Sequence, residues 1–387
     1  MYVSLIRNAA VLPVPWVQVN WFSHKHGRQS FKPCSLLLGE SCPCPASKAR
    51  RSPSTPNSMP RGVFTPEVDD VVRLRRSRPD WYSSKVRLEN SDHSPRRSAP
   101  DLAPDSVEAA ADLKLYLDGE AIYGDDFGPS QIADWFEAEK EGYADLGSKD
   151  RGSYKYGYHA LNRIHGYRAL PKDSRFRHAL GFGSAYGDEL LPIIERTERV
   201  TIVDPSDHFA GSQLAGRPVE WVKPHPTGTL PFSDRAFDLI TCFGVLHHVP
   251  NVSHVLNEFY RVLIPGGLVL VEEPIVSMGD WRRPRPGLTT HERGLPLGPL
   301  RDSIARSGLT TRALHLTGFG PLVWLVRKLG WRTAYNSELF TWGDWLLAES
   351  ARRNYSYHSY RNTIRERLRP TSMFAILERP RSGDASP

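Results

Sequence analysis

The sequence predicts an α/β fold: a doubly wound, mostly parallel sheet of seven strands, with helices N-terminal to it and an aromatic-rich insertion before the last strand. Three observations predict this fold. Hydrophobic and β-branched runs alternate with helical segments between residues 175 and 380, a glycine-rich segment follows the first run, and an aspartate ends the second. Such alternation is typical of parallel sheets with helical connections, whose ligand crevice lies at the carboxyl ends of the strands.

The expected strands lie, in chain order, at residues 177–182, 200–204, 220–222, 237–243, 268–272, 311–316 and 371–378. Helices are expected at 188–198, 253–263 and 300–307. The insertion at about 318–368 holds many aromatic residues between Trp324 and Tyr360. Aromatic side chains can bound a pocket for an apolar or sugar-like ligand, and they can equally form the insertion's own core.

The segments on either side of this domain have a different composition. Residues 1–104 are rich in Pro, Ser and Arg, so we expect a disordered basic tail, and residues 381–387 form a second short tail. Residues 105–174 are expected to form a helical extension, with helices near 105–119 and from Pro129 onward. Its aromatic-rich part, which includes Tyr158 and His159, is interpreted either as a helix buried against the main domain or as a lid.

Composition limits the classes of function. The chain has 387 residues, 40% of them hydrophobic, and lacks an uninterrupted apolar run of the roughly 18 residues that span a membrane. Residues 1–100 hold 16 Lys and Arg against 7 Asp and Glu, whereas the rest holds 34 against 36. The net charge of +7 therefore belongs to the tail, and the near-neutral remainder argues against a nucleic-acid partner.

Cysteine usage and the N-terminus bear on metals and location. Four cysteines are too few and too unevenly spaced for a disulfide framework or a four-ligand zinc site, so no metal is expected. The first sixty residues contain one acid, Glu40, as in organelle transit peptides, but they lack a clear amphipathic helix with arginines. A cytoplasmic location is therefore expected, with organelle targeting as the alternative.

The loop after the first strand is the strongest local signal of a ligand site. Gly183-Ser184-Ala185-Tyr186-Gly187 allows the backbone to turn tightly and to approach a ligand where side chains would collide. Asp204 follows at the tip of the second strand, where a carboxylate can accept both hydroxyls of a ribose. This pair suits any cofactor that contains adenosine.

Three further segments resemble a known family. Leu230–Ile240 reads LPFSDRAFDLI, Val245–Pro250 reads VLHHVP, and Tyr260–Gly267 reads YRVLIPGG. They resemble the LPF, FDLI, LHH and RVLKPGG series of class I S-adenosylmethionine-dependent methyltransferases, in the type 11-like subgroup. The resemblance implies a Rossmann-like fold, S-adenosyl-L-methionine as cofactor and methyl transfer to an O or N atom. The HERG-PL segment that starts at His291 favours a small-molecule acceptor such as a sugar or secondary metabolite.

The resemblance also implies which residues bind the cofactor: Gly181, Gly183, Ala185, Gly187, Asp204, Leu230 and Phe243. Within this set, Asp204 is expected to bind the ribose, and the glycine-rich loop the methionine part. The sequence departs from the family pattern at Gly181, where an acid is usual, and at Ala185, where glycine is usual. The acid that often contacts adenine after the third strand falls on a stretch around Pro226 that has none.

Methyl transfer depends mainly on positioning, so few catalytic side chains are needed. His247 and His248 follow the fourth strand and are candidates for a general base, although the pair can also stabilise the turn. Glu272 and Glu273 end the fifth strand, and with Tyr158, His159 and Arg293 they are candidates for substrate binding.

Two other functions fit parts of the pattern. A catalytically degenerate scaffold protein with this fold would explain the departures at Gly181 and Ala185. A nicotinamide-dependent oxidoreductase or epimerase would use the same glycine loop and Asp204, but it has no need of the LPF and FDLI series.

Overall fold

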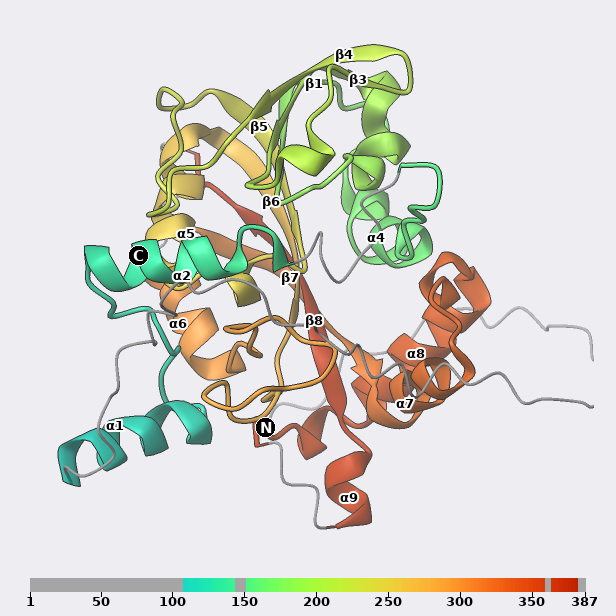
Figure 1. Cartoon of the computed structure of the whole chain (residues 1–387). Coiled ribbons are helices and arrows are strands. Elements are labelled where there is room, and N and C mark those ends of the chain that lie inside the picture. The colour runs from blue at the N-terminus through green and yellow to red at the C-terminus, as the bar shows by residue number, and fades with distance from the viewer. Residues whose placement is uncertain (1–106, 143–150, 359–362, 382–387) are drawn as a thin grey trace, which may run out of the picture. The chain divides into compact units, whose positions relative to one another are not determined.

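The computed structural model describes residues 107–142, 151–358 and 363–381 (Figure 1). The chain divides into two units, Met1–Asp92 and His93–Pro387, and every described residue belongs to the second. The predicted tail at residues 1–104 therefore lies outside the described residues, as do residues 382–387.

The described unit is built on one sheet of eight strands in the order β3-β4-β2-β1-β5-β6-β8-β7. The strands are β1 (Phe176–Phe182), β2 (Thr197–Val203), β3 (Gln213–Leu214), β4 (Arg217–Val222), β5 (Phe237–Phe243), β6 (Leu263–Pro274), β7 (Thr310–Phe319) and β8 (Pro370–Glu378). Seven of them correspond to the seven predicted strands, which confirms the fold class. The eighth, β3, is a two-residue strand that pairs antiparallel with β4 at the edge of the sheet.

Strand direction and order place the ligand crevice. β1 pairs in parallel with β2 and β5, and β5 pairs in parallel with β6, while β8 runs antiparallel between β6 and β7. The chain winds outward in one direction from β1 and in the other from β5. A crevice opens at the carboxyl ends of strands where the winding reverses, here after Phe182 and Phe243.

Helices cover both faces of the sheet (Figure 1). One side carries α2 (Pro129–Glu139), α5 (Val252–Val262) and α6 (Leu297–Arg306), and the other carries α4 (His159–His165), α7 (Gly320–Leu329) and α8 (Glu338–Ser350). The remaining α-helices of the described chain are α1 (Val107–Asp118) and α9 (Ile364–Arg367). The predicted helices before the domain and the predicted insertion before the last strand are therefore both present.

One predicted helix has a different form. Residues 188–198 were expected to be an α-helix, but the structure has the 3₁₀ helix η2 over Asp188–Arg196, and β2 begins at Thr197. Pro192 lies inside this segment. Because proline has no N–H and its ring clashes with the preceding turn, it disfavours a regular α-helix there.

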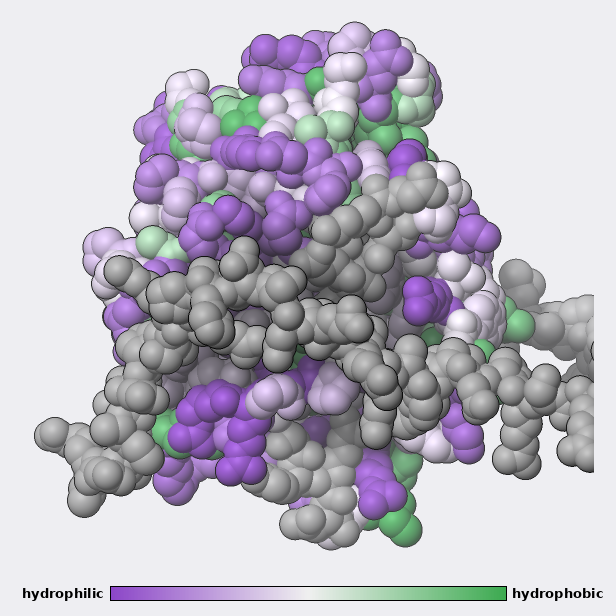
Figure 2. Space-filling model, viewed as in Figure 1, coloured by the Kyte–Doolittle hydropathy of each residue, from purple (hydrophilic) through white to green (hydrophobic). Residues whose placement is uncertain are grey.

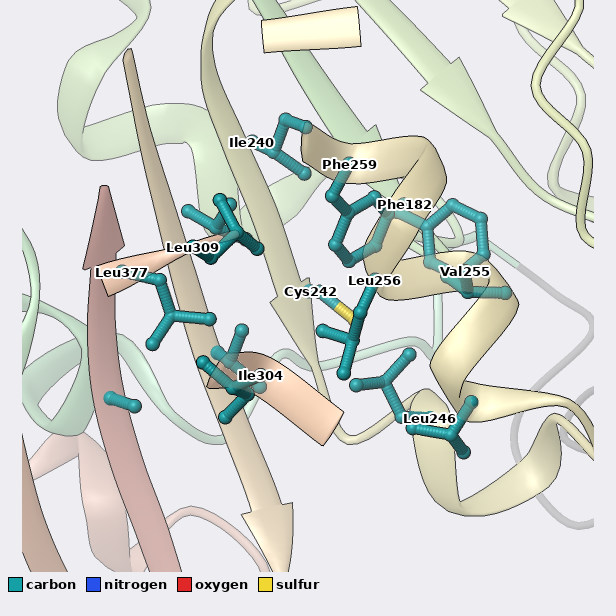
Figure 3. Close-up of a cluster of buried hydrophobic side chains, with 14 of the residues drawn as sticks. Phe182, Ile240, Cys242, Leu246, Val255, Leu256, Phe259, Ile304, Leu309 and Leu377 are labelled. Carbon is teal, nitrogen blue, oxygen red and sulfur yellow. The ribbon is translucent and has the colours of Figure 1, made fainter. Parts of the chain in front are cut away.

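Two hydrophobic cores lie on opposite faces of the sheet. On the face covered by α5, Val255, Leu256 and Phe259 pack with Phe182 and Cys242 (Figure 3). On the other face, Leu161 of α4 packs with residues of η2 and the sheet. The described surface in Figure 2 is mainly hydrophilic, as expected when the sheet is covered on both faces.

Among the described residues, no helix combines the length and the hydrophobicity needed to cross a membrane.

Candidate functional site

A cavity of about 490 Å³ opens at the carboxyl ends of the central strands. Its size falls within the range of small-molecule sites, roughly 300–1,000 Å³. The sequence-predicted residues that line it are Tyr158, Gly183, Ala185, Asp204, Phe243, His247, His248 and Glu272. Residues expected from separate motifs thus meet in one cavity at the point where the winding of the sheet reverses.

Asp204 holds the glycine-rich loop in place. Its Oδ2 accepts a hydrogen bond from the Ala185 amide at 2.9 Å, and its Oδ1 accepts one from the Ser206 amide at 3.0 Å. Ala185 has φ +48°, in the left-handed region that costs a residue with a Cβ roughly 1–2 kcal/mol. The bond to Asp204 therefore supports the conformation that glycine would adopt without strain at this position.

Gly181 occupies the position where the family pattern has an acid, and its surroundings leave little room for a side chain. A Cβ at Gly181 would lie 2.4 Å from Ser184 Oγ and 3.1 Å from Leu190 Cδ1, so a larger side chain does not fit there. Glu189, in η2, is 4% exposed and lines the cavity next to this loop. Glu189 thus lines the cavity from a different element than β1, and it was not predicted from the sequence.

Glu273 organises the turn that follows β5. Its carboxylate accepts hydrogen bonds from the amides of Val245, Leu246 and His247 at 2.9, 2.6 and 3.2 Å. It also lies 2.8 Å from Nδ1 of His247. Glu273 is fully buried, so it positions His247 and the turn from beneath and does not line the cavity.

His248 is held from the side of the N-terminal extension. Its Nδ1 lies 3.0 Å from Oε2 of Glu139, at the end of α2, and 3.2 Å from Thr289 Oγ1. Trp135 of the same helix donates a hydrogen bond from its indole nitrogen to the His248 carbonyl at 2.7 Å. Burial lowers the pKa of His248, which favours its neutral form.

Neighbouring residues Glu292 and Arg293 have separate environments. Glu292 lines the cavity, and its Oε2 accepts a hydrogen bond from the Thr289 amide at 3.0 Å. The Arg293 guanidinium donates to the carbonyls of His247, Val249 and Pro250 at 2.9, 2.8 and 3.1 Å. Arg293 is 1% exposed and does not line the cavity. Its hydrogen bonds stabilise residues 245–250, which we call the histidine turn.

Three carboxyl groups of the cavity have raised pKa values. Burial raises the pKa of Asp204 to about 6 and that of Glu189 to about 7. Burial, with the nearby charge of Glu273, raises the pKa of Glu272 to about 8. A cation bound in the cavity would favour their ionised forms, because an opposite charge lowers the pKa of a carboxyl group.

Other predicted residues lie away from the cavity. Gly181 and Gly187 shape the loop from behind, and Leu230 is part of the hydrophobic core beside α5. His159 begins α4, where its amide donates to Asn336 Oδ1 at 2.7 Å. The preceding residue, Tyr158, was also predicted to contact substrate, and it does line the cavity. Its ring stacks on that of Tyr335, with ring centroids 5.8 Å apart.

The insertion contributes charge to the cavity wall. Arg327 of α7 and Arg332 after it both line the cavity. Several of its aromatic side chains instead face solvent: Trp324, Trp331 and Trp342 are each more than a third exposed. Tyr357 is buried, and its hydroxyl donates to the Gly294 carbonyl at 2.9 Å.

Sequence reasoning also missed the carboxylates Glu139 and Glu292. Glu139 reaches His248 across 109 positions of the chain, so no local motif could reveal the contact. Glu292 lies in the HERG segment next to Arg293, the residue that was predicted to bind substrate. Glu189 follows Gly187 by two positions, but Asp188 stands beside it, so the sequence alone does not distinguish which of the two acids lines the cavity.

Comparison with known proteins agrees with this architecture. Residues 179–271 match the family described as a methyltransferase domain, which spans β1 to β6 and holds the glycine-rich loop, Asp204 and the histidine turn.

Individual relatives match over shorter stretches. A Mycolicibacterium smegmatis protein named as a probable S-adenosylmethionine-dependent methyltransferase is 27% identical over 146 residues, covering 37% of this chain and 56% of that protein. An uncharacterized methyltransferase of Mycobacterium tuberculosis is 37% identical over 93 residues, covering 24% of this chain and 33% of that protein. The chain thus spans less than two thirds of the length of either relative.

Among solved structures, the [4+2]-cyclase SpnF is similar with a TM-score of 0.41 and 15% identity, covering 68% of this chain and 98% of that one. The family match and the named relatives confirm the resemblance that the sequence motifs indicated, together with the cofactor that it implies. Residues 179–271 of the chain therefore match a methyltransferase domain, of the class I S-adenosylmethionine-dependent type that the motifs indicated.

Proposed function

We propose that this protein transfers the methyl group of S-adenosylmethionine to an oxygen or nitrogen atom of a small molecule. The observation that carries the proposal is the single cavity in which the glycine-rich loop and Asp204 face the histidine turn and Glu292. The wall with the glycine-rich loop and Asp204 suits a nucleoside. The wall with the histidine turn and Glu292 has side chains that can accept a proton from the methyl acceptor.

The residues of the first wall fit the cofactor. Asp204, buried at the end of β2, is the acceptor for the ribose hydroxyls, and the loop at Gly183 lets the ligand approach the backbone. Glu189 is the carboxylate for the methionine ammonium, because Gly181 has no side chain to supply one. The raised pKa values of these carboxyls match a ligand that carries positive charge.

The second wall positions the acceptor. His247 is bound to Glu273 through Nδ1, which leaves Nε2 directed toward Glu292, with the atoms 3.9 Å apart. Arg327 and Arg332 add positive charge to the same cavity, so an acceptor with a carboxylate or phosphate would be bound as well. The cavity volume limits the acceptor to a small molecule or to the end of a larger one.

The cofactor supplies an electrophilic methyl group on a sulfonium. The protein's own contribution is to hold the acceptor atom in line with that methyl group and to help remove its proton. The side chains of His247 and His248, which both line the cavity, are the groups of the histidine turn that can accept this proton.

The test is formation of S-adenosylhomocysteine by the full chain, followed by mass spectrometry, with a panel of hydroxylated and amino small molecules. Acceptor-dependent turnover that is lost in Asp204→Asn but kept in the nearby surface variant Asp207→Asn supports the proposal. Binding of the cofactor without turnover on any acceptor favours a degenerate scaffold instead, and binding of NAD favours an oxidoreductase.

A further inference from the structure

Two imidazoles and one carboxylate converge on the acceptor side of the cavity. One ligand atom from each of His247, His248 and Glu292 lies within 4.8 Å of the other two. All three residues line the cavity. Two of them come from the turn after β5, and the third comes from the segment before α6, 44 positions later in the chain.

The two imidazoles are oriented as metal ligands usually are. Histidine ligands commonly donate their second ring nitrogen to a carboxylate, which fixes the ring and its tautomer. Here Nδ1 of His247 lies 2.8 Å from Glu273, and Nδ1 of His248 lies 3.0 Å from Glu139. Each carboxylate is itself held by backbone amides, from residues 245–247 for Glu273 and from His291 for Glu139. Nε2 is then the nitrogen that each ring can offer to an ion.

The third ligand is also oriented. Oε2 of Glu292 accepts the Thr289 amide, while Oε1 lies 3.9 Å from Nε2 of His247. That separation is too long for a hydrogen bond, so the two atoms do not satisfy one another directly. Metal bonds of about 2.1 Å put neighbouring ligand atoms roughly 3 to 3.4 Å apart. Ligand atoms that lie 3.9 Å apart, and up to 4.8 Å apart across the cluster, therefore need to close by about 0.5 to 1.8 Å around an ion.

The charge balance at this point favours a cation. Glu139, Glu273 and Glu292 are gathered around the two imidazoles, and all three are at most 9% exposed. Two guanidinium groups lie nearby: Arg285 donates to the carbonyls of Thr289 and Thr290, and Arg293 donates to those of the histidine turn. Their charges attract Glu292, Glu139 and Glu273, but two guanidinium groups do not balance three carboxylates. Buried carboxylates are normally paired with a positive charge or coordinate a metal.

We propose that His247, His248 and Glu292 bind a divalent transition-metal ion that receives the hydroxyl of the methyl acceptor. Two imidazoles with one carboxylate suit ions such as Zn²⁺ or Mn²⁺, and three protein ligands leave positions open toward the cavity. This inference rests on the proposed function and narrows the acceptor to a hydroxylated molecule. His247 then acts as a ligand and not as the base.

The chemistry of the step follows from the ligand set. A hydroxyl oxygen bound to the ion loses its proton to solvent more easily, because the ion stabilises the alkoxide. A lone pair of that oxygen forms the bond to the methyl carbon while the carbon–sulfur bond breaks. The electron pair of the broken bond stays on sulfur, which becomes neutral.

The test uses the full chain, freed of any affinity tag and of bound metal by dialysis against EDTA and then metal-free buffer. Zn²⁺ is titrated by calorimetry, and Mn²⁺ is followed by the loss of the free-ion signal in electron paramagnetic resonance. We expect saturable binding of one ion per chain. Zinc should also raise the unfolding temperature, because an ion that binds only the folded chain stabilises it.

Two variants separate ligands from bystanders. Glu292→Gln keeps an oxygen for the Thr289 amide but removes the ligand charge, and it should weaken metal binding at least tenfold. Glu139→Gln disturbs the carboxylate behind His248 and should weaken binding about 10- to 100-fold. Glu141→Gln is the matched control, since Glu141 lies two positions beyond Glu139 and its carboxylate accepts from Ser206 Oγ at 2.9 Å.

The outcomes distinguish the metal site from the proposed function. Failure of the wild-type chain to bind either ion saturably overturns the inference, as does equal affinity in wild type and Glu292→Gln. S-adenosylmethionine is titrated into the same metal-free protein. Cofactor binding without metal binding leaves the proposed function standing and makes the histidine cluster a structural network, whereas metal binding without cofactor binding contradicts the proposed function.

Discussion

Replacing Asp204 with asparagine is expected to weaken binding of the cofactor without unfolding the protein. An ionised carboxylate offers about four lone-pair positions. Two of these are used by the amides of Ala185 and Ser206, at 2.9 and 3.0 Å, which leaves two for the hydroxyls of a ribose. Asparagine has only one oxygen and no charge, so at least one hydroxyl loses its charged acceptor.

The size of the effect follows from that count. A hydrogen bond to a charged group contributes about 1.5–3 kcal/mol, so losing one weakens binding by roughly 10- to 150-fold. Calorimetry with S-adenosylhomocysteine measures this directly. Asp207→Asn is the control, because Asp207 lies three positions further on, with an exposed side chain that pairs with Lys223 at 2.6 Å. An Asp204→Asn affinity within twofold of wild type would refute the assignment of the ribose site.

The same residue predicts a dependence on pH. Burial raises the pKa of Asp204 to about 6, and the hydroxyls require its ionised form. Cofactor affinity should therefore be full above pH 6 and should fall by up to about tenfold per pH unit below it. In Asp204→Asn this decline should be absent, and a decline of equal slope in the variant would assign the titration to another group.

Three further changes test the cavity and the core. Glu189→Gln should stabilise the ligand-free protein at pH 8 by up to about 3 kcal/mol in urea unfolding, because burial raises the pKa of Glu189 from 4.5 to about 7. Between these pH values the unfolded chain loses the proton while the folded chain keeps it, so the gain should be complete above pH 7 and should vanish as the pH falls toward 4.5. Gly183→Ala should destabilise by a few kcal/mol, since its φ is +67° and a Cβ would lie 2.4 Å from Val245. Gly216→Ala, with φ +78° and open space, should cost less, and equal losses would argue against the collision. Phe259→Ala should cost about 3–5 kcal/mol as a fully buried core residue, and a loss below about 1 kcal/mol would contradict the packing in Figure 3.

The strands could be predicted from the sequence because their signals are local. The run Phe237–Phe243 forms β5 as expected, and Asp204 directly follows β2. Apolar residues at these positions are buried from both sides, which makes parallel strands read as continuous hydrophobic runs. The glycine-rich loop likewise depends on neighbouring residues, and its positive φ angles at Gly183 and Gly187 agree with the expected tight turn.

Features that depend on distant contacts could not be predicted in this way. The carboxylates of Glu139 and Glu292 reach the histidine turn only through tertiary packing, over 109 and 45 positions of the chain. Arg293 was expected to meet substrate, but its guanidinium is bound to three backbone carbonyls, which no pattern of spacing reveals. The departure at Gly181 was visible in the sequence, whereas the position of Glu189 in the cavity wall required the three-dimensional arrangement.

The most direct test of the central claim is calorimetric titration of the full chain with S-adenosylmethionine, S-adenosylhomocysteine and NAD. The cavity with Asp204, Glu189 and the glycine-rich loop predicts that the first two bind at one site per chain and that NAD does not. Binding of NAD, or silence from all three ligands, would contradict the claim that this cavity is a cofactor site for methyl transfer.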